Sequence, residues 1–138
     1  MKSEVKIFIN YAHDDQARVA PLYQKLRREG FKPWMDKHDI LPGEKWELAI
    51  KRAIRDCDFF LICLSKNSVN KRGVLQKEIR IALDICQGMI DNDIYIIPVR
   101  LEECDAPESL QDFQGVDWFE KDGWTKLKNA IQVGMDRR

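Results

Sequence analysis

The chain has 138 residues, which suits one domain with a single hydrophobic core and leaves no room for two. It is 44% hydrophobic and 33% charged, and its 23 basic and 23 acidic residues give a formal net charge of zero. This balance is typical of a soluble globular protein and gives no electrostatic reason to expect nucleic acid or an anionic membrane as a partner.

The hydrophobic period alternates between strand and helix spacing along the chain, with no internal repeat. A first strand is predicted over residues 5–10 and a first helix over 15–29, which Gly30 closes because glycine tolerates positive φ. Pro21 lies inside this helix and predicts a kink or a late start. A short strand over 31–35 follows, and we expect it at an edge of the sheet.

The middle of the chain continues this alternation. A loop over 36–44 is followed by a helix that ends at Asp56. Residues 59–65 are almost wholly apolar, which is typical of a central parallel strand with helices on both faces. A helix over 73–87 then leads to a fourth strand over 94–99.

The last part of the chain completes a sheet. Pro98 cannot donate to a ladder and predicts where pairing of the fourth strand ends. Residues 116–119 predict a short fifth strand, and 123–135 a terminal amphipathic helix. Right-handed crossovers then favour an α/β, flavodoxin-like three-layer fold with a five-stranded parallel sheet of order 2-1-3-4-5 and helices on both faces. We expect one domain over 1–138.

Targeting signals and metal motifs are not apparent in the sequence. The amino terminus lacks an apolar signal region and the longest apolar run, residues 59–64, is too short to cross a bilayer, so we expect a cytoplasmic protein. His13 and His38 have no partners at metal-ligand spacing, so we expect no metal site. Four cysteines without CxxC spacing predict small buried thiols: Cys57, Cys63, Cys86 and Cys104.

Glu78 is the first candidate for chemistry. Apolar residues recur at helical spacing over 73–87, and a carboxylate interrupts one of their rows at position 78. It can be a charge favoured by the helix macrodipole or paired with a nearby lysine. It can equally be a carboxylate at the border of a cleft that stabilises a cation. The pattern leaves both interpretations open.

Other candidates lie where strands end, since ligands of open α/β sheets bind at the strand carboxyl ends, here between strands one and three. Trp34 can be a core residue, or its ring can stack on a nucleobase or nicotinamide with Tyr11 as the opposite wall. Ser65 and Asn67 can cap the turn after the third strand or bind sugar and phosphate oxygens.

Several functions of flavodoxin-like proteins are excluded by the same residues. A phosphoacceptor receiver needs an aspartate at the end of the third strand, where this chain has Cys63, Leu64 and Ser65. The sequence contains no P-loop and no GxGxxG, and the turn after the first strand lacks a phosphate cradle for a flavin.

The chain resembles the Toll/interleukin-1 receptor (TIR) domain family, particularly its bacterial branch, over nearly its whole length. The resemblance rests on a series of segments in the family's order and spacing: KIFINYAHDD (6–15), GFKPWMD (30–36), DILPGEKW (39–46), AIRDCDFFLICLSKNSVNKRG (53–73), QKEI (76–79) and IIPVRLEECDAPESL (96–110). One class of the family hydrolyses NAD+ and the other acts as non-enzymatic adaptors through TIR–TIR contacts.

Membership in the catalytic class would give the residues definite roles. The family's catalytic glutamate, in the helix after the third strand, falls on Glu78, and NAD+ is then the substrate, with no cofactor. The substrate-binding positions fall on Tyr11, Ala12, Trp34, Asp36, Ser65 and Val74. A loop that completes the site of a neighbouring subunit falls on Ile40, Leu41, Pro42, Gly43 and Trp46.

The resemblance therefore implies a TIR NAD+ glycohydrolase that releases nicotinamide and leaves ADP-ribose or a cyclic form. It would be activated by self-assembly with other TIR domains in a bacterial defence or signalling system. The alternative is an adaptor without turnover. Since sensor domains normally accompany a TIR domain, the chain could be a piece of a longer protein.

Overall fold

The computed structural model describes residues 4–35, 40–69, 74–90 and 93–138, with only the helical backbone described at 74–76. Its centre is a parallel five-stranded sheet in the order β2-β1-β3-β4-β5, which confirms the predicted topology. The strands are β1 (Lys6–Asn10), β2 (Lys32–Met35), β3 (Phe59–Leu64), β4 (Ile96–Arg100) and β5 (Val116–Asp117).

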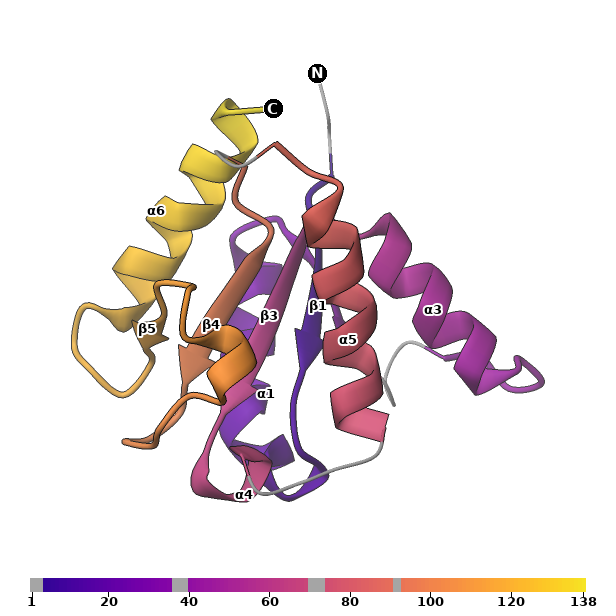
Figure 1. Cartoon of the computed structure of the whole chain (residues 1–138), viewed down its shortest axis with the longest axis horizontal. Coiled ribbons are helices and arrows are strands. Elements are labelled where there is room, and N and C mark those ends of the chain that lie inside the picture. The colour runs from indigo at the N-terminus through magenta and orange to yellow at the C-terminus, as the bar shows by residue number, and fades with distance from the viewer. Residues whose placement is uncertain (1–3, 36–39, 70–73, 91–92) are drawn as a thin grey trace.

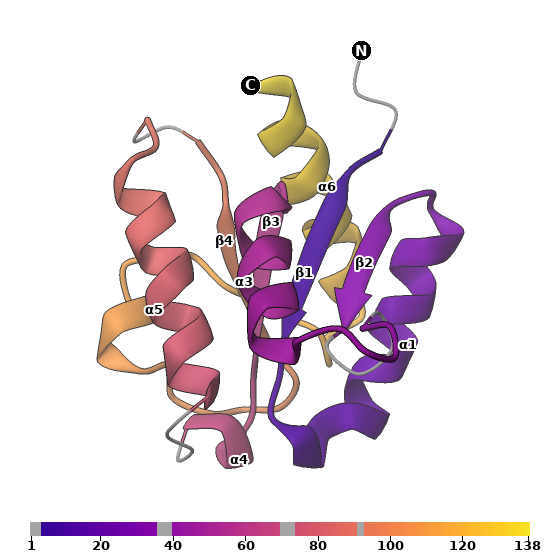
Figure 2. The ribbon, with the colours of Figure 1, turned by 90° about the vertical axis from the view of Figure 1, so that its right-hand side faces the viewer.

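Helices cover both faces of this sheet. They are α1 (Gln16–Arg28), α3 (Trp46–Asp56), α4 (Lys66–Val69), α5 (Val74–Gln87) and α6 (Gly123–Asp136), with short 3-10 turns η1 (His13–Asp15) and η2 (Glu108–Leu110). Figure 1 shows α6 on one side of the sheet and α3 and α5 on the other, and Figure 2 shows α3 and α5 from their own side. The result is the predicted three-layer, flavodoxin-like α/β fold.

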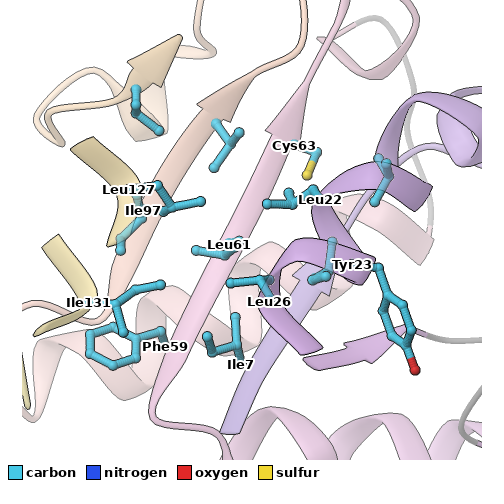
Figure 3. Close-up of a cluster of buried hydrophobic side chains, with 14 of the residues drawn as sticks. Ile7, Leu22, Tyr23, Leu26, Phe59, Leu61, Cys63, Ile97, Leu127 and Ile131 are labelled. Carbon is cyan, nitrogen blue, oxygen red and sulfur yellow. The ribbon is translucent and has the colours of Figure 1, made fainter. Parts of the chain in front are cut away.

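The first core cluster lies between the sheet and α1 with α6. Strand side chains of one parity, such as Ile9 and Leu61, meet the apolar stripe of α1, which includes Leu22 and Leu26. Figure 3 shows these helix residues and Ile131 of α6 directed toward the same row of strand side chains. This packing fixes α1 and therefore the turn that leads into it from β1.

The second core cluster lies under α3 and α5. Its strand residues have the other parity, and three of them form a row of stacked rings: the ring centroids of Phe8 and Trp34 are 5.0 Å apart, as are those of Phe8 and Phe60. Ile50 of α3 and Ile79 of α5 pack on this row. Offset-stacked rings at such distances add specific attraction to the area that they bury.

The end of α1 is as predicted, whereas its start differs in detail. Gly30 has φ of 90°, and its N–H bonds to Arg27 O while the N–H of Phe31 bonds to Leu26 O, which is a Schellman motif. The regular helix begins at Gln16 after η1 and runs through Pro21, which is exposed.

The prediction that pairing of β4 ends at Pro98 was wrong, because β4 pairs with β3 as far as Arg100. The carbonyl of Tyr95 and the N–H of Leu101 both bond to β3. In a parallel strand the backbone groups of alternate residues bond to the same neighbour, so residues 97 and 99 also face β3. The nitrogen of Pro98 therefore faces the opposite side of β4. The strand on that opposite side is β5, and it begins only at Val116, which pairs with Val99. The missing N–H of proline therefore removes no bond to β3.

The carboxyl ends of the strands gather at one end of the molecule. Figure 1 shows both chain termini at one end and α4 with the start of α5 at the other, where β1 and β3 finish. None of the helices within the described ranges is both long and apolar enough to span a membrane. The fold thus brings the ends of β1 and β3 and the beginning of α5 into one region.

We expect the free energy of unfolding to fall as the pH rises above about 8.5, the ordinary pKa of cysteine. Burial raises the pKa of Cys57 to about 11 and raises the pKa of Cys63 and of Tyr95, whose hydroxyl donates to Ile54 O at 3.1 Å. Because each folded-state pKa lies above its unfolded value, the stabilisation is complete below the unfolded value and is lost as the pH rises toward the folded one.

Urea unfolding at pH 7, 9, 10 and 11 would measure this slope, which can reach about 1.4 kcal/mol per pH unit for each buried group. Tyr95→Phe should flatten the part of the slope above pH 10. A free energy of unfolding that stays constant from pH 7 to 11 would contradict the expectation.

Candidate functional site

Glu78 and Asn10 form a buried polar pair between α5 and the end of β1. Glu78 is 8% exposed and Asn10 is 1% exposed, and Asn10 Nδ2 donates to Glu78 Oε1 at 2.8 Å. Side chains alternate along a strand, so Asn10 points to the same face as Phe8, which is the face that α5 covers. The end of the strand thus places an amide against the helix carboxylate.

The carbonyl oxygen of Asn10 is the second feature of this pair. Among the described residues, Asn10 Oδ1 is the one buried side-chain nitrogen or oxygen without a hydrogen-bond partner. An unsatisfied buried acceptor costs roughly 1–3 kcal/mol, and native structures contain few of them. An unpartnered acceptor beside a buried carboxylate therefore sets this pair apart from the other buried polar side chains of the described residues.

A small hollow opens beside Glu78, between α3 and α5. The described residues enclose about 40 Å³, far below the roughly 300–1,000 Å³ of a typical ligand pocket. It is lined by aromatic, aliphatic, cationic and carboxylate side chains: Trp46, Glu47, Ile50, Lys51, Lys77, Glu78 and Ile81. Trp46, predicted as part of the assembly loop, is the first residue of α3, is 51% exposed and lies beside Glu78 in the same chain.

Trp34 and Tyr11, predicted as two walls of one crevice, pack on different faces of the sheet. One face of Trp34 stacks on Phe8 in the cluster under α3 and α5, and the residue lines a separate cavity of about 620 Å³ along the edge strand β2. Tyr11 packs against the cluster under α1 and α6. The structure does not bring the two rings together.

Ser65 belongs to a buried network centred on Asp15, which is fully buried. The Ser65 hydroxyl donates to Asp15 Oδ2 and accepts from the N–H of Ser68 at 3.1 Å, and Asn67 Nδ2 lies 3.4 Å from Asp15 Oδ1. Ala12 is buried in the same turn, and its carbonyl accepts from the N–H of Asp15. This network joins the turn after β1 to the end of β3, so Ser65 has a structural role here.

A cation borders the outer side of this network. Arg18 Nη1 lies 3.9 Å from Asp15 Oδ1 and 3.1 Å from Glu102 Oε1, and Glu102 also accepts from the N–H of Lys66 at 2.8 Å. Burying a carboxylate is costly unless it is paired and hydrogen-bonded, and Asp15 is both. The network therefore fixes the relative position of β1, β3 and the loop after β4.

The predicted assembly loop projects from the molecule before α3. The N–H of Glu44 bonds to Leu41 O at 3.1 Å, and Pro42 followed by Gly43 with φ of 90° fits a type II turn. The Leu41 N–H donates to Glu44 Oε1 at 2.7 Å. Leu41 is 67% exposed, whereas Ile40 packs against the cluster under α3 and α5. The turn thus presents an apolar side chain to its surroundings.

Two predicted substrate positions lie beyond what the structure describes. Asp36 is outside the described residues, and Val74 is the first residue of α5 with only its backbone described. Sequence reasoning missed the roles of Asn10 and Asp15. A polar residue closing an apolar strand, in phase with Phe8, was the available signal for Asn10. Within the described ranges, no group of three His, Cys, Asp or Glu side chains could hold a metal ion.

Comparison with known proteins identifies the family. Residues 7–131 match the TIR domain family, TIR_2, so the chain belongs to that family. It is 28% identical over 113 residues to the uncharacterized protein y4cD of Sinorhizobium fredii, a match that covers 80% of this chain and 18% of that protein. The chain thus spans less than a fifth of the length of this relative.

Solved structures share the same fold. The TIR domain of the Toll-related receptor TRR-2 from Hydra magnipapillata is 27% identical with a TM-score of 0.76, and the match covers 91% of this chain and 97% of that one. The CMP N-glycosidase BcmB of Clostridium botulinum is 17% identical with a TM-score of 0.60, over 89% of this chain and 97% of that one. At this identity the second likeness concerns the fold alone.

We expect Ser65→Ala to lower the free energy of unfolding by about 1–3 kcal/mol, because it removes a donor to a buried carboxylate. Urea unfolding at neutral pH would measure the loss. Asn67→Ala is the matched control, since its exposed side chain bonds to the same carboxylate at 3.4 Å and should contribute less. Equal losses in the two variants would show that Ser65 does not anchor the network.

Proposed function

We propose that this TIR domain is an NAD+ glycohydrolase that cleaves the bond between nicotinamide and ribose, giving nicotinamide and ADP-ribose or a cyclic ADP-ribose. The observation that carries the proposal is Glu78. It is a carboxylate in the helix after β3, more than nine-tenths buried, and held at 2.8 Å by an amide at the end of β1. Perturbed or buried carboxylates in such positions are frequent at functional sites.

The leaving group makes a single carboxylate sufficient. An ordinary glycosidase needs two carboxyl groups, because its leaving oxygen must be protonated while an oxocarbenium-like centre is stabilised. In NAD+ the leaving group is a pyridinium that departs as neutral nicotinamide, so no general acid is required. Glu78 would hydrogen-bond the ribose hydroxyls and stabilise the positive charge that develops on the ribose, an effect that a site poor in water strengthens.

The other residues of the hollow suit the rest of the substrate. The exposed ring of Trp46 can stack on a heterocycle, and the ammonium groups of Lys51 and Lys77 can attract the diphosphate. Ring contact by Trp34 and binding by Tyr11, Ala12, Asp36, Ser65 and Val74 remain part of the proposal, except that Trp34 and Tyr11 do not form two walls of one crevice. A TIR-like fold carries N-glycosidase activity in BcmB, which supports this kind of chemistry on such a fold.

Self-assembly is the second part of the proposal. The hollow beside Glu78 is too small to enclose NAD+ within the described residues of one chain. Leu41 projects from its turn with 67% exposure, and the neighbouring ring of Trp46 is half-exposed. In an assembly the loop of one subunit would complete the site of the next, so activity would depend on protein concentration or on a trigger.

The same exposed loop is compatible with a second function, that of a non-enzymatic adaptor that binds other TIR domains. The small volume of the hollow favours this alternative, whereas the buried Glu78 favours the enzyme. In either case we place the chain in the cytoplasm as a single domain over 1–138, acting in a bacterial defence or signalling system. A sensor domain or protein would then supply the trigger.

Glu78→Gln should lower nicotinamide release from NAD+ by at least about 10²-fold, since it keeps the shape of the side chain and removes the charge. Turnover would be measured at rising protein concentration and with a crowding agent. Asp84→Asn, an exposed change on the same helix, is the matched control and should keep parental activity. No turnover by a parent that light scattering shows to be assembled would favour the adaptor.

Gly43→Leu and Leu41→Asp should each lower assembly and NAD+ turnover together, by about 10-fold or more, without unfolding the domain. A Cβ added at Gly43 would meet no other atom within 4 Å, so the strain of the substitution lies in the turn, at φ of 90°. Leu48→Asp, an exposed apolar position outside the loop, is the control. Full activity in a monodisperse Gly43→Leu variant would contradict the assembly model.

A further inference from the structure

Asn10 offers more than support for Glu78. Asn10 Nδ2 donates to Glu78 Oε1 at 2.8 Å, which is the arrangement that a carboxylate acting as acceptor requires. Turning the amide over would place two acceptors against each other. This contact orients the amide, and Oδ1 is left as a buried acceptor with no partner among the described residues.

Buried structural pairs rarely leave such an atom without a partner. The neighbouring network at the end of β3 illustrates the difference: the hydroxyls of Ser65 and Ser68 and both oxygens of Asp15 have partners. Both clusters are buried at the same end of the sheet. Buried acceptors are paired as a rule, so an exception at a helix carboxylate indicates that a donor arrives from outside.

We propose that Asn10 and Glu78 together form a double acceptor for the adjacent hydroxyl groups of the substrate ribose, Glu78 through its carboxylate and Asn10 through Oδ1. The inference rests on the proposed function and deepens it, because it names Asn10 as the residue that makes the site require a ribosyl nucleotide. The Asn10 amide N–H holds the carboxylate in the orientation in which it faces the sugar.

The chemistry of the pair matches this ligand. Adjacent hydroxyl groups of a ribose each bring a donor, and the site presents two acceptors linked by a hydrogen bond. A site built to accept from a substrate hydroxyl discriminates strongly against an analogue that lacks it, because the buried acceptor is then left unpaired. Substrate binding would give Asn10 Oδ1 a hydrogen-bond donor, whereas an analogue that lacks the matching hydroxyl would leave Oδ1 without a partner.

The test compares NAD+ with two analogues in which the nicotinamide ribose lacks its 2′- or its 3′-hydroxyl. The parent should prefer NAD+ over at least one analogue by about 10-fold or more in kcat/KM. Asn10→Ala should lower kcat/KM for NAD+ by a similar factor and leave that analogue nearly unaffected, so that the preference collapses. Asn10→Ser, whose hydroxyl both donates and accepts, should restore part of the preference. Asp84→Asn, an exposed change on α5, is the control.

Each outcome decides a different question. If Asn10→Ala slows NAD+ and the analogues equally, Asn10 has only a structural role and the inference is overturned while the enzyme stands. If the parent has no turnover, calorimetric titration with the same three nucleotides replaces kinetics. A ribose preference in binding that Asn10→Ala removes would then support the inference, and with an assembled parent it would count against the enzyme, whereas no binding would overturn both. Asn10→Ser carries the comparison if Asn10→Ala does not fold.

Discussion

The burial of β3 on both faces is the constraint on which the rest of this structure depends. All six of its residues are buried, so each face needs a layer of helices, and the polar backbone groups of its edges need strands on both sides. β1 and β4 meet that need, α1 and α6 cover one face, and α3 and α5 cover the other. Loops can then lie only at the two ends of the sheet.

Polar side chains at the carboxyl end of the sheet are consequently buried, and each needs partners there. Asp15 finds them in Ser65, Asn67 and Arg18, and this network holds the turns after β1 and β3 together. Glu78 finds one in Asn10. In the first cluster every side-chain oxygen of Asp15, Ser65 and Ser68 has a partner. In the second, Asn10 Oδ1 is buried without a partner among the described residues.

The residues around Glu78 are compatible with both proposed functions, an enzyme and an interaction module. The carboxylate is buried, yet the hollow beside it is small and is bordered by a half-exposed Trp46. An exposed Leu41 stands on a turn held by Gly43 and by the Glu44 carboxylate. Association of subunits through such a turn would alter the surroundings of Glu78 without any change to the core.

The hydrophobic periodicity of the sequence predicted most of the fold but less of the candidate site. The alternation of strand and helix spacing gave the sheet order, the edge position of β2 and the central position of β3. It failed at Pro98, because a proline is tolerated in a paired strand when its nitrogen faces a side with no bond to make. The prediction that Trp34 and Tyr11 face each other was also wrong, because the alternation of side chains along the strands places them on opposite faces of the sheet.

By itself the sequence determined the family, the layered α/β fold and the carboxylate at position 78, since these follow from local periodicity and from motifs contiguous in the chain. Only the tertiary structure decided that Asn10 meets Glu78 across 68 residues, that Asp15 binds Ser65, and that Trp46 borders the hollow. Hydrogen bonds between distant segments depend on how strands are ordered and helices are seated, and local spacing does not contain that information.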